Sequence, residues 1–156
     1  MRYMVLLSLV ANTSALPARA AAPAVAVLLG KGVQIYECAQ AEAGFVWRLK
    51  APDAILTDAA GRRVGRHFAG PSWQAEDGSI VTGEVLVASR AAQADAIPWL
   101  VLKAKMRSGD GLFSAVAYIV RSATMGGVAP AGGCDAAHGG AETRVDYSAT
   151  YTFFSG

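Results

Sequence analysis

Hydrophobic and polar residues alternate along most of this chain, which is the pattern of β-strands that bury one face. Segment 33–38 alternates throughout, and in segment 45–50 apolar residues occupy every odd position while basic residues occupy two of the even ones. These two segments predict a hairpin that turns within 39–44. The same pattern predicts further strands at 64–68, 73–75, 80–88, 99–106, 112–121 and 143–154.

Short clusters of turn-forming residues separate the predicted strands. Gly and Asp, the residues that tight reversals require, occur at 58–61, 76–79 and 108–111. Helical pattern is scarce, because the one candidate turn at 91–96 is followed by Pro98, which favours extended backbone before it. The sequence therefore predicts an all-β, single-domain antiparallel β-sandwich or β-barrel with one long irregular loop at about 122–142.

The composition fits one folded domain. The chain has 156 residues, 53% of them are hydrophobic, and the net charge is only +2. A chain this apolar and this weakly charged does not remain disordered. Its length supports one hydrophobic core rather than two.

The first segment of the chain has the features of an export signal. Arg2 precedes an apolar run at 4–10, and Ala-Arg-Ala at 18–20 has the form of a signal-peptidase site. We therefore predict a signal peptide at 1–20 and a mature domain at 21–156 that is secreted or periplasmic. A transmembrane anchor is the alternative, but the run is shorter than the roughly 20 residues of a spanning helix. No later segment reaches that length, so no integral membrane segment is expected after signal removal.

Removal of the signal also changes the charge. Without Arg2 and Arg19 the 14 basic residues become 12, equal to the 12 acidic residues, so the mature domain carries no net charge. A domain without a basic stripe offers little attraction to polyanions. We therefore expect no nucleic-acid partner and no binding to an acidic membrane surface.

Cys38 and Cys134 predict one disulfide, because an even number of cysteines in an exported chain usually pairs. The bridge would connect an early strand to the late loop. A zinc site is the competing interpretation. Neither cysteine has a C-x-x-C partner, and the two histidines, His67 and His138, are scattered, so no metal is expected.

The common catalytic and cofactor motifs are missing from the sequence. It contains no G-x-S-x-G, no G-x-G-x-x-G before a helix and no G-x-x-x-x-G-K-[ST]. The glycine pairs at 126–127 and 132–133 are not followed by a helical pattern, so we interpret them as turns rather than a phosphate loop. No cofactor is expected, and the sequence leaves open whether the protein is an enzyme.

His67 is one candidate for a functional residue. It lies on the strand face opposite Val64 and Phe68, so it points outward if those two side chains point inward. Beside Trp73 and Asp77 it could act as a general base or as a donor to a ligand. A structural histidine remains the alternative. Trp73 itself is either a core residue or part of a sugar-stacking platform.

Arg121 is a second candidate, because it ends a strand face that is otherwise apolar. It could form a salt bridge with Asp135 or Glu142 from the long loop, which would fix that loop beside the disulfide. Alternatively, it could hold the carboxylate of a ligand.

Five groups of residues resemble the domain of unknown function 3455 family. They are Gly-Val-Gln-Ile-Tyr-Glu-Cys at 32–38, Gly65 with His-Phe-Ala-Gly-Pro-Ser-Trp at 67–73, Asp-Gly-Ser at 77–79, Ala-Ile-Pro-Trp-Leu at 96–100, and Gly-Gly-Val-Ala-Pro at 126–130 with Gly-Cys-Asp at 133–135. The resemblance covers the chain from about Gly32 and implies a small exported protein with no established activity. Members usually carry more sequence before this first motif. We therefore expect a shortened or missing first strand and an open sheet edge.

Two function classes remain. The first is a binding module for a small molecule, a glycan or a protein partner. The alternative is a small cofactor-free enzyme in which His67 with Asp77, or Asp135 with Glu142, forms an acid–base pair. For either class we place the site where His67, Trp73 and Asp77 approach Arg121 and the long loop.

Overall fold

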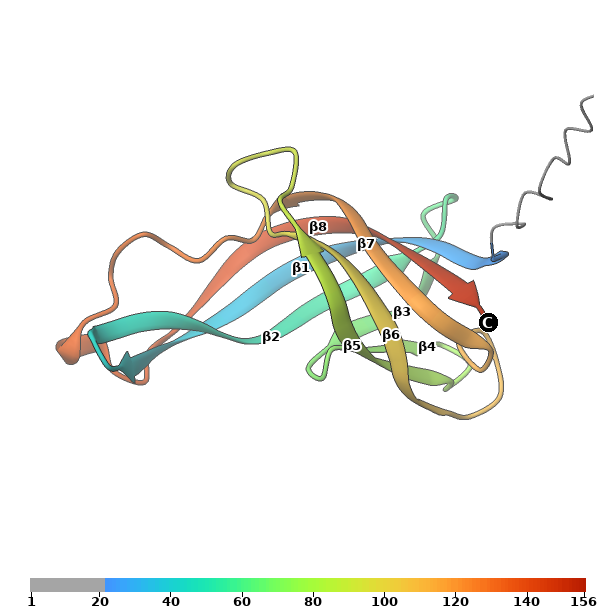
Figure 1. Cartoon of the computed structure of the whole chain (residues 1–156), viewed down its shortest axis with the longest axis horizontal. Coiled ribbons are helices and arrows are strands. Elements are labelled where there is room, and N and C mark those ends of the chain that lie inside the picture. Colours follow the sequence, from blue (N-terminus) through green and yellow to red (C-terminus); the bar gives the residue numbers. More distant parts are fainter. Residues whose placement is uncertain (1–21) are drawn as a thin grey trace, which may run out of the picture.

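The computed structural model describes residues 22–156 as a closed ring of antiparallel strands, in which each strand pairs with its neighbours in the sequence and β8 closes onto β1 (Figure 1). The strands are β1 (Ala24–Ala41), β2 (Gly44–Thr57), β3 (Arg63–Phe68), β4 (Ser72–Ala75), β5 (Ile80–Ser89), β6 (Trp99–Ser108), β7 (Val116–Gly126) and β8 (Glu142–Ser155), with one short 3₁₀ helix, η1 (Ala136–His138). The all-β prediction is confirmed, and of the two predicted architectures the structure has the barrel.

The first strand is long rather than short, which corrects the expectation of an open edge. β1 begins at Ala24 and pairs with β2 on one side and with β8 on the other, down to Glu37 opposite Glu142. The alternation pattern did not predict the first half of β1, because Val27 and Leu29 are apolar although they lie exposed on the outer wall. With apolar residues on both faces, this stretch has no period-two signal.

The barrel interior is a tightly packed aromatic core. Its largest fully buried side chains are Trp73, Tyr151, Phe113, Phe153, Leu56, Leu102 and Ile119. Glycines allow the strands to pack closely around these rings. A Cβ at Gly30 would lie 2.5 Å from Cε2 of Tyr151, so the absent side chain makes room for this ring.

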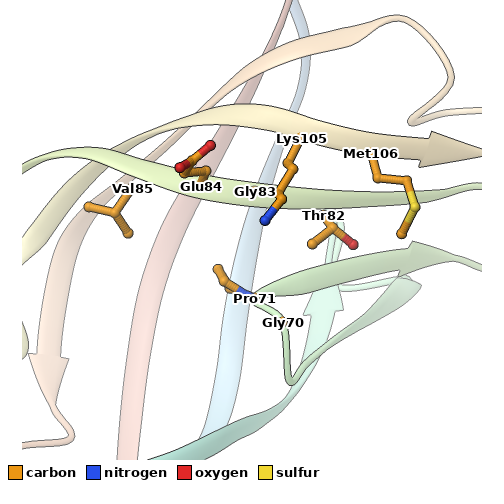
Figure 2. Close-up of a pocket in the computed structure, with 8 residues that line it drawn as sticks. All are labelled: Gly70, Pro71, Thr82, Gly83, Glu84, Val85, Lys105 and Met106. Atoms are coloured by element: carbon orange, nitrogen blue, oxygen red, sulfur yellow. The ribbon is translucent and has the colours of Figure 1, made fainter.

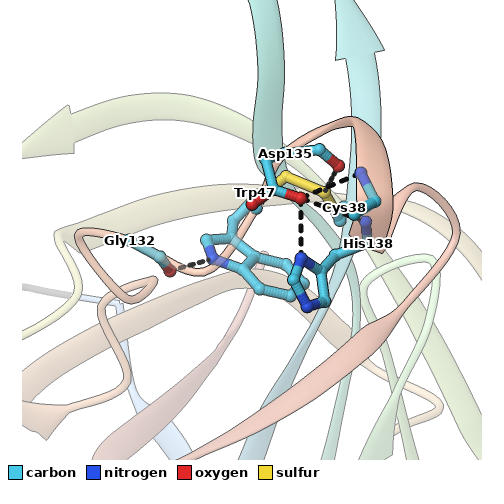
Figure 3. The surroundings of a disulfide bond; sticks show 7 residues. Cys38, Trp47, Gly132, Asp135 and His138 are labelled. Atoms are coloured by element: carbon cyan, nitrogen blue, oxygen red, sulfur yellow. Dashed lines mark hydrogen bonds and ion pairs between the residues drawn. A yellow bond between two sulfur atoms is a disulfide. The ribbon is translucent and has the colours of Figure 1, made fainter.

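Beyond the barrel, the hairpin of β1 and β2 and the start of β8 continue as a three-stranded arm, seen at the left of Figure 1. The loop 127–141 between β7 and β8 runs along this arm. The predicted disulfide is present: Cys38 of β1 and Cys134 of the loop are bonded, with 5.3 Å between their Cα atoms. Nearby, the indole N–H of Trp47 donates to the carbonyl of Gly132 at 2.8 Å (Figure 3). The loop is therefore fixed to the arm by one covalent bond and by side-chain contacts.

The seventh strand differs from its predicted position. Segment 112–115 is a turn, and the strand runs from Val116 to Gly126, so the irregular loop is shorter than 122–142. Phe113 is buried in this turn, which explains why its apolar pattern looked like a strand. Among residues 22–156 no helix is long and apolar enough to cross a membrane.

Candidate functional site

His67 points into the barrel, which corrects the expectation that it faces outward. Its exposed fraction is 2%, and its ring stacks on Trp73 with 4.5 Å between centroids and 10° between planes. His67 of β3 lies directly opposite Trp73 of β4 in the sheet. Val64 and Phe68, at the alternate positions of β3, are only partly buried, and the guanidinium of Arg66 covers the Phe68 ring at 4.7 Å. His67 therefore lies on the inward face of β3 and stacks on Trp73 there.

The His67 ring is neutral near pH 7. Its Nδ1 lies 2.8 Å from the carbonyl oxygen of Ser72, and a carbonyl only accepts, so Nδ1 carries the hydrogen. Burial is the main cause that lowers the pKa of His67 to about 3, the hydrogen bond to Ser72 opposes it, and the charge of Arg121 lowers it further. Nε2 forms no hydrogen bond with any side chain or backbone group of residues 22–156, so its lone pair can accept a hydrogen bond.

Arg121 of β7 is half-buried beside this ring. Its Nε and Nη2 both donate to the carbonyl oxygen of Pro98, at 3.0 and 2.8 Å. Within the part of the chain that the structure describes, no carboxylate lies within 4 Å of its guanidinium. Burial lowers the pKa of Arg121, and the hydroxyls of Tyr151 and Tyr147 partly oppose this shift. Arginine nevertheless remains protonated in proteins, so the site holds a positive charge without a protein counter-ion.

A pocket of about 340 Å³ opens at the end of the barrel where the arm begins. We call it the mouth pocket; its polar wall is formed by Gln34, Lys50, His67 and Arg121, and its apolar wall by Leu49, Pro52, Pro71, Val85 and Leu100. Of the two cations, Lys50 is paired with Glu142, whereas Arg121 has no carboxylate partner among the described residues. Gln34 is 1% exposed, and its Oε1 has no hydrogen-bond partner among the described residues. A buried amide oxygen without a donor is costly, and the indole N–H of Trp73 is a second buried polar group without a partner among the described residues.

Buried tyrosines line the barrel interior next to this pocket. The hydroxyls of Tyr147 and Tyr151 lie 3.1 Å apart, and that of Tyr36 donates to the carbonyl of Gly127 at 2.7 Å. Burial raises the pKa of each of these three tyrosines, so all three stay protonated. The layer of tyrosine hydroxyls beneath the pocket is thus polar and uncharged.

Sequence reasoning missed Gln34 and these tyrosines as site residues. Gln34, Tyr36 and Cys38 share one face of the alternating segment 33–38, and that face turns inward. The sequence analysis recognised the alternation of this segment but did not assign its inward face. Polar residues at every second position of a strand were the available signal.

Asp77 lies at a different place from His67. It follows β4, where Oδ1 accepts from the backbone N–H and the hydroxyl of Ser79 and Oδ2 accepts from the N–H of Leu112 at 2.8 Å. These hydrogen bonds lower the pKa of Asp77. Its carboxylate connects two turns at the barrel surface and does not line the mouth pocket.

Asp135 and Glu142 lie on the arm and do not meet Arg121. Oδ1 of Asp135 caps η1 and lies 2.6 Å from Nδ1 of His138 (Figure 3). Glu142 pairs with Lys50 of β2. The expected ion pair of Arg121 with Asp135 or Glu142 is therefore absent, because each carboxylate has a nearer partner.

A second hollow, of about 580 Å³, lies on the outer wall (Figure 2). We call it the outer groove; it is lined by Gly70, Pro71, Thr82, Gly83, Glu84, Val85, Lys105 and Met106. Gly70, Pro71 and Val85 also line the mouth pocket, so the two hollows adjoin.

Residues 22–156 contain no group of three or more metal-ligating side chains.

The family described as "Protein of unknown function (DUF3455)" matches residues 17–155. The chain belongs to this family. No curated protein and no solved structure matches it. Membership confirms the resemblance carried by the sequence motifs, but the family description assigns no activity, so the function has to be argued from the site.

Three of the five groups of residues that carry the family resemblance contribute to the mouth pocket. Gln34 belongs to the first motif, and His67 with Pro71 to the second. The motif at 96–100 supplies Leu100 to the pocket wall and Pro98 to the Arg121 hydrogen bonds. Motifs far apart in the sequence therefore build one site.

Proposed function

We propose that this protein is a binding domain for a small organic anion that enters the mouth pocket. The observation that supports it best is Arg121, a half-buried cation without a protein carboxylate. The Pro98 carbonyl accepts from two N–H groups of the Arg121 guanidinium. A guanidinium has five N–H donors, so others remain for a ligand. An incoming carboxylate would gain charge-assisted hydrogen bonds in a partly desolvated place, where they are strong.

The remaining polar atoms of the pocket define the rest of the ligand. Oε1 of Gln34 and Nε2 of His67 are both acceptors without a donor in the described chain. A ligand that carries a hydroxyl or N–H group next to its carboxylate would satisfy both the cation and an acceptor. Such a ligand matches the mouth pocket in charge and in hydrogen bonding.

Binding is favoured over acid–base catalysis. His67 and Asp77 lie at separate places, and Asp135 and Glu142 are engaged by other partners on the arm. With a pKa of about 3, His67 is a weak proton acceptor at neutral pH. The alternative of a cofactor-free enzyme therefore lacks a suitable pair of groups in one pocket.

A ligand screen tests the proposal. Thermal shift with organic acids, sugars and metal ions, followed by calorimetry on the hits, should select hydroxylated or amino-substituted organic acids. Arg121→Gln should weaken their binding by about 10- to 100-fold, the range for hydrogen bonds to a charged group. Arg48→Gln removes an arginine from the exposed face of β2 outside the pocket and should leave binding unchanged.

The same screen can contradict the proposal. If neutral sugars or metal ions are selected and acids are not, or if Arg121→Gln binds the acids as tightly as the natural protein, Arg121 does not hold an anion. Because Arg121 also ties β7 to Pro98, the unfolding midpoint of Arg121→Gln is measured alongside. Arg121→Lys, which keeps the charge, should retain part of the affinity.

We infer that the domain acts after export. The predicted signal at 1–20 lies outside the residues that the structure describes. The Cys38–Cys134 bond supports this inference, because such bridges persist in oxidising compartments.

A further inference from the structure

We propose that the ligand is an amphipathic acid whose apolar chain passes from the mouth pocket over Val85 and Pro71 into the outer groove. This inference rests on the proposed function, because it places the acid group at Arg121. The inference adds that the rest of the ligand is an apolar chain, and it gives the path of that chain over the protein surface.

The apolar wall of the mouth pocket faces solvent. Leu49 is 51% exposed and Val85 is 47% exposed, and they line the pocket together with Leu100. A ligand with only polar groups would leave this wall in water. An apolar chain would cover it, and burial of apolar surface is the main source of binding energy in pockets of this kind.

The outer groove continues this apolar path. Figure 2 shows Val85 and Met106 on the strand side of the groove and Pro71 on the turn opposite. Met106 is 65% exposed, the largest value among the exposed large hydrophobic residues of the described chain. A flexible, exposed methionine in a groove is well suited to adapt to an alkyl chain.

The polar groups of the outer groove do not require a second charged group on the ligand. Glu84 and Lys105 carry opposite charges, so the groove has no net charge. The Thr82 hydroxyl is already paired with the hydroxyl of Ser72 at 2.8 Å. The groove therefore fits an uncharged chain, with the single acid group at the Arg121 end.

A series of straight-chain acids tests the inference. Hexanoate, octanoate, decanoate and dodecanoate are titrated below their micelle concentrations, with Trp fluorescence and calorimetry as readouts. A fully buried methylene strengthens binding by up to about fourfold. We expect dodecanoate to bind at least about tenfold more tightly than hexanoate.

Two pairs of variants test where the alkyl chain of the ligand lies. Met106→Gln should weaken dodecanoate binding several-fold and leave hexanoate within about twofold, because only the longer chain reaches the far end of the groove. Met125→Gln, at an exposed methionine outside both hollows, is the matched control and should change neither. Val85→Thr should weaken all four acids, whereas Val27→Thr on the outer wall of β1 should weaken none.

The outcomes separate this inference from the proposed function. If the acids bind in an Arg121-dependent way but without a dependence on chain length, or if Met106→Gln has no effect on dodecanoate, the groove path is wrong and the proposed function stands. If dodecanol or dodecylamine binds as tightly as dodecanoate and Arg121→Gln has no effect, the anion site itself is wrong.

Discussion

At the scale of single residues, the mouth pocket combines a histidine that is held neutral with an arginine that stays charged. The Trp73 ring covers His67, and the Ser72 carbonyl fixes its tautomer. Arg121 lies close enough to disfavour a second positive charge on that ring. His67 therefore donates through Nδ1 to Ser72 and offers Nε2 as an acceptor, whereas Arg121 only donates.

The depressed pKa of His67 predicts a dependence of stability on pH. In the folded state this pKa is about 3, against about 6.5 when unfolded. Between these values the unfolded chain binds more protons, so stability falls as the pH falls below about 6.5, by up to roughly 1.4 kcal/mol per pH unit. Urea unfolding at pH 7 and pH 5 should show a loss of about 2 kcal/mol that His67→Gln largely abolishes.

His138→Gln is the matched control for this experiment. His138 is exposed at the end of η1 beside Asp135, so this variant removes the second histidine of the described chain while His67 stays in place. If His67 causes the loss between pH 7 and pH 5, most of that loss should remain in His138→Gln. Equal losses in the natural protein and in His67→Gln would show that His67 is not buried in the neutral form.

At the scale of elements, the sequence predicted the alternating strands well and failed where both faces of a strand are apolar. Segments 80–88 and 99–106 agree with β5 and β6. The first half of β1 was missed because its outer face is also apolar. Alternation shows that a strand has two different faces, and does not show which face a barrel encloses, so His67 was assigned to the wrong side.

The structure brings together only some of the residues that the sequence singled out as site candidates. His67, Trp73 and Arg121 do lie near one another, because β3, β4 and β7 contribute to the same barrel. Asp135 and Glu142 do not join them. Their position depends on how far the arm extends, and strand length beyond the barrel cannot be derived from local pattern.

The arm and its disulfide give a prediction at the scale of elements. Cys38 and Cys134 close a loop with a sequence separation of 96, for which the chain-entropy model gives roughly 4 to 5 kcal/mol as an upper figure. The double variant Cys38→Ser, Cys134→Ser should lower the unfolding free energy by about 2 to 4 kcal/mol in urea. Thiol titration of the denatured, non-reduced natural protein should detect no free sulfhydryl.

Hydrogen exchange of the backbone amides then shows which part of the molecule the disulfide stabilises. The amides of residues 38 and 140 are hydrogen-bonded to Ala141 and Cys38 across the arm, and they should lose protection in the double variant. The amides of β3 and β4 in the barrel should keep it. Unchanged stability, or free thiols in the natural protein, would contradict the role given to this bridge.

At the scale of the whole molecule, the pocket and the ends of the described chain lie at opposite ends of the barrel. The start of β1 and the C-terminus are neighbours, and the N–H of Ser155 donates to the carbonyl of Pro23 at 3.3 Å (Figure 1). Gln34 of the pocket lies ten positions further along β1, which is roughly 30 Å at strand spacing. Processing at the N-terminal side would therefore leave the proposed binding site intact.

Export with cleavage after Ala20 is the prediction for the complete chain. Arg2, the apolar run at 4–10 and Ala-Arg-Ala at 18–20 support it, and the cut would leave three residues before β1 begins at Ala24. Mass spectrometry of protein from the medium or periplasm should find Ala21 as the N-terminus. Ala18→Lys, which places a long charged side chain where the peptidase requires a small residue, should block processing, whereas Ala22→Lys beyond the cut should permit it. Detection of only the uncleaved chain in the cytoplasm would refute export.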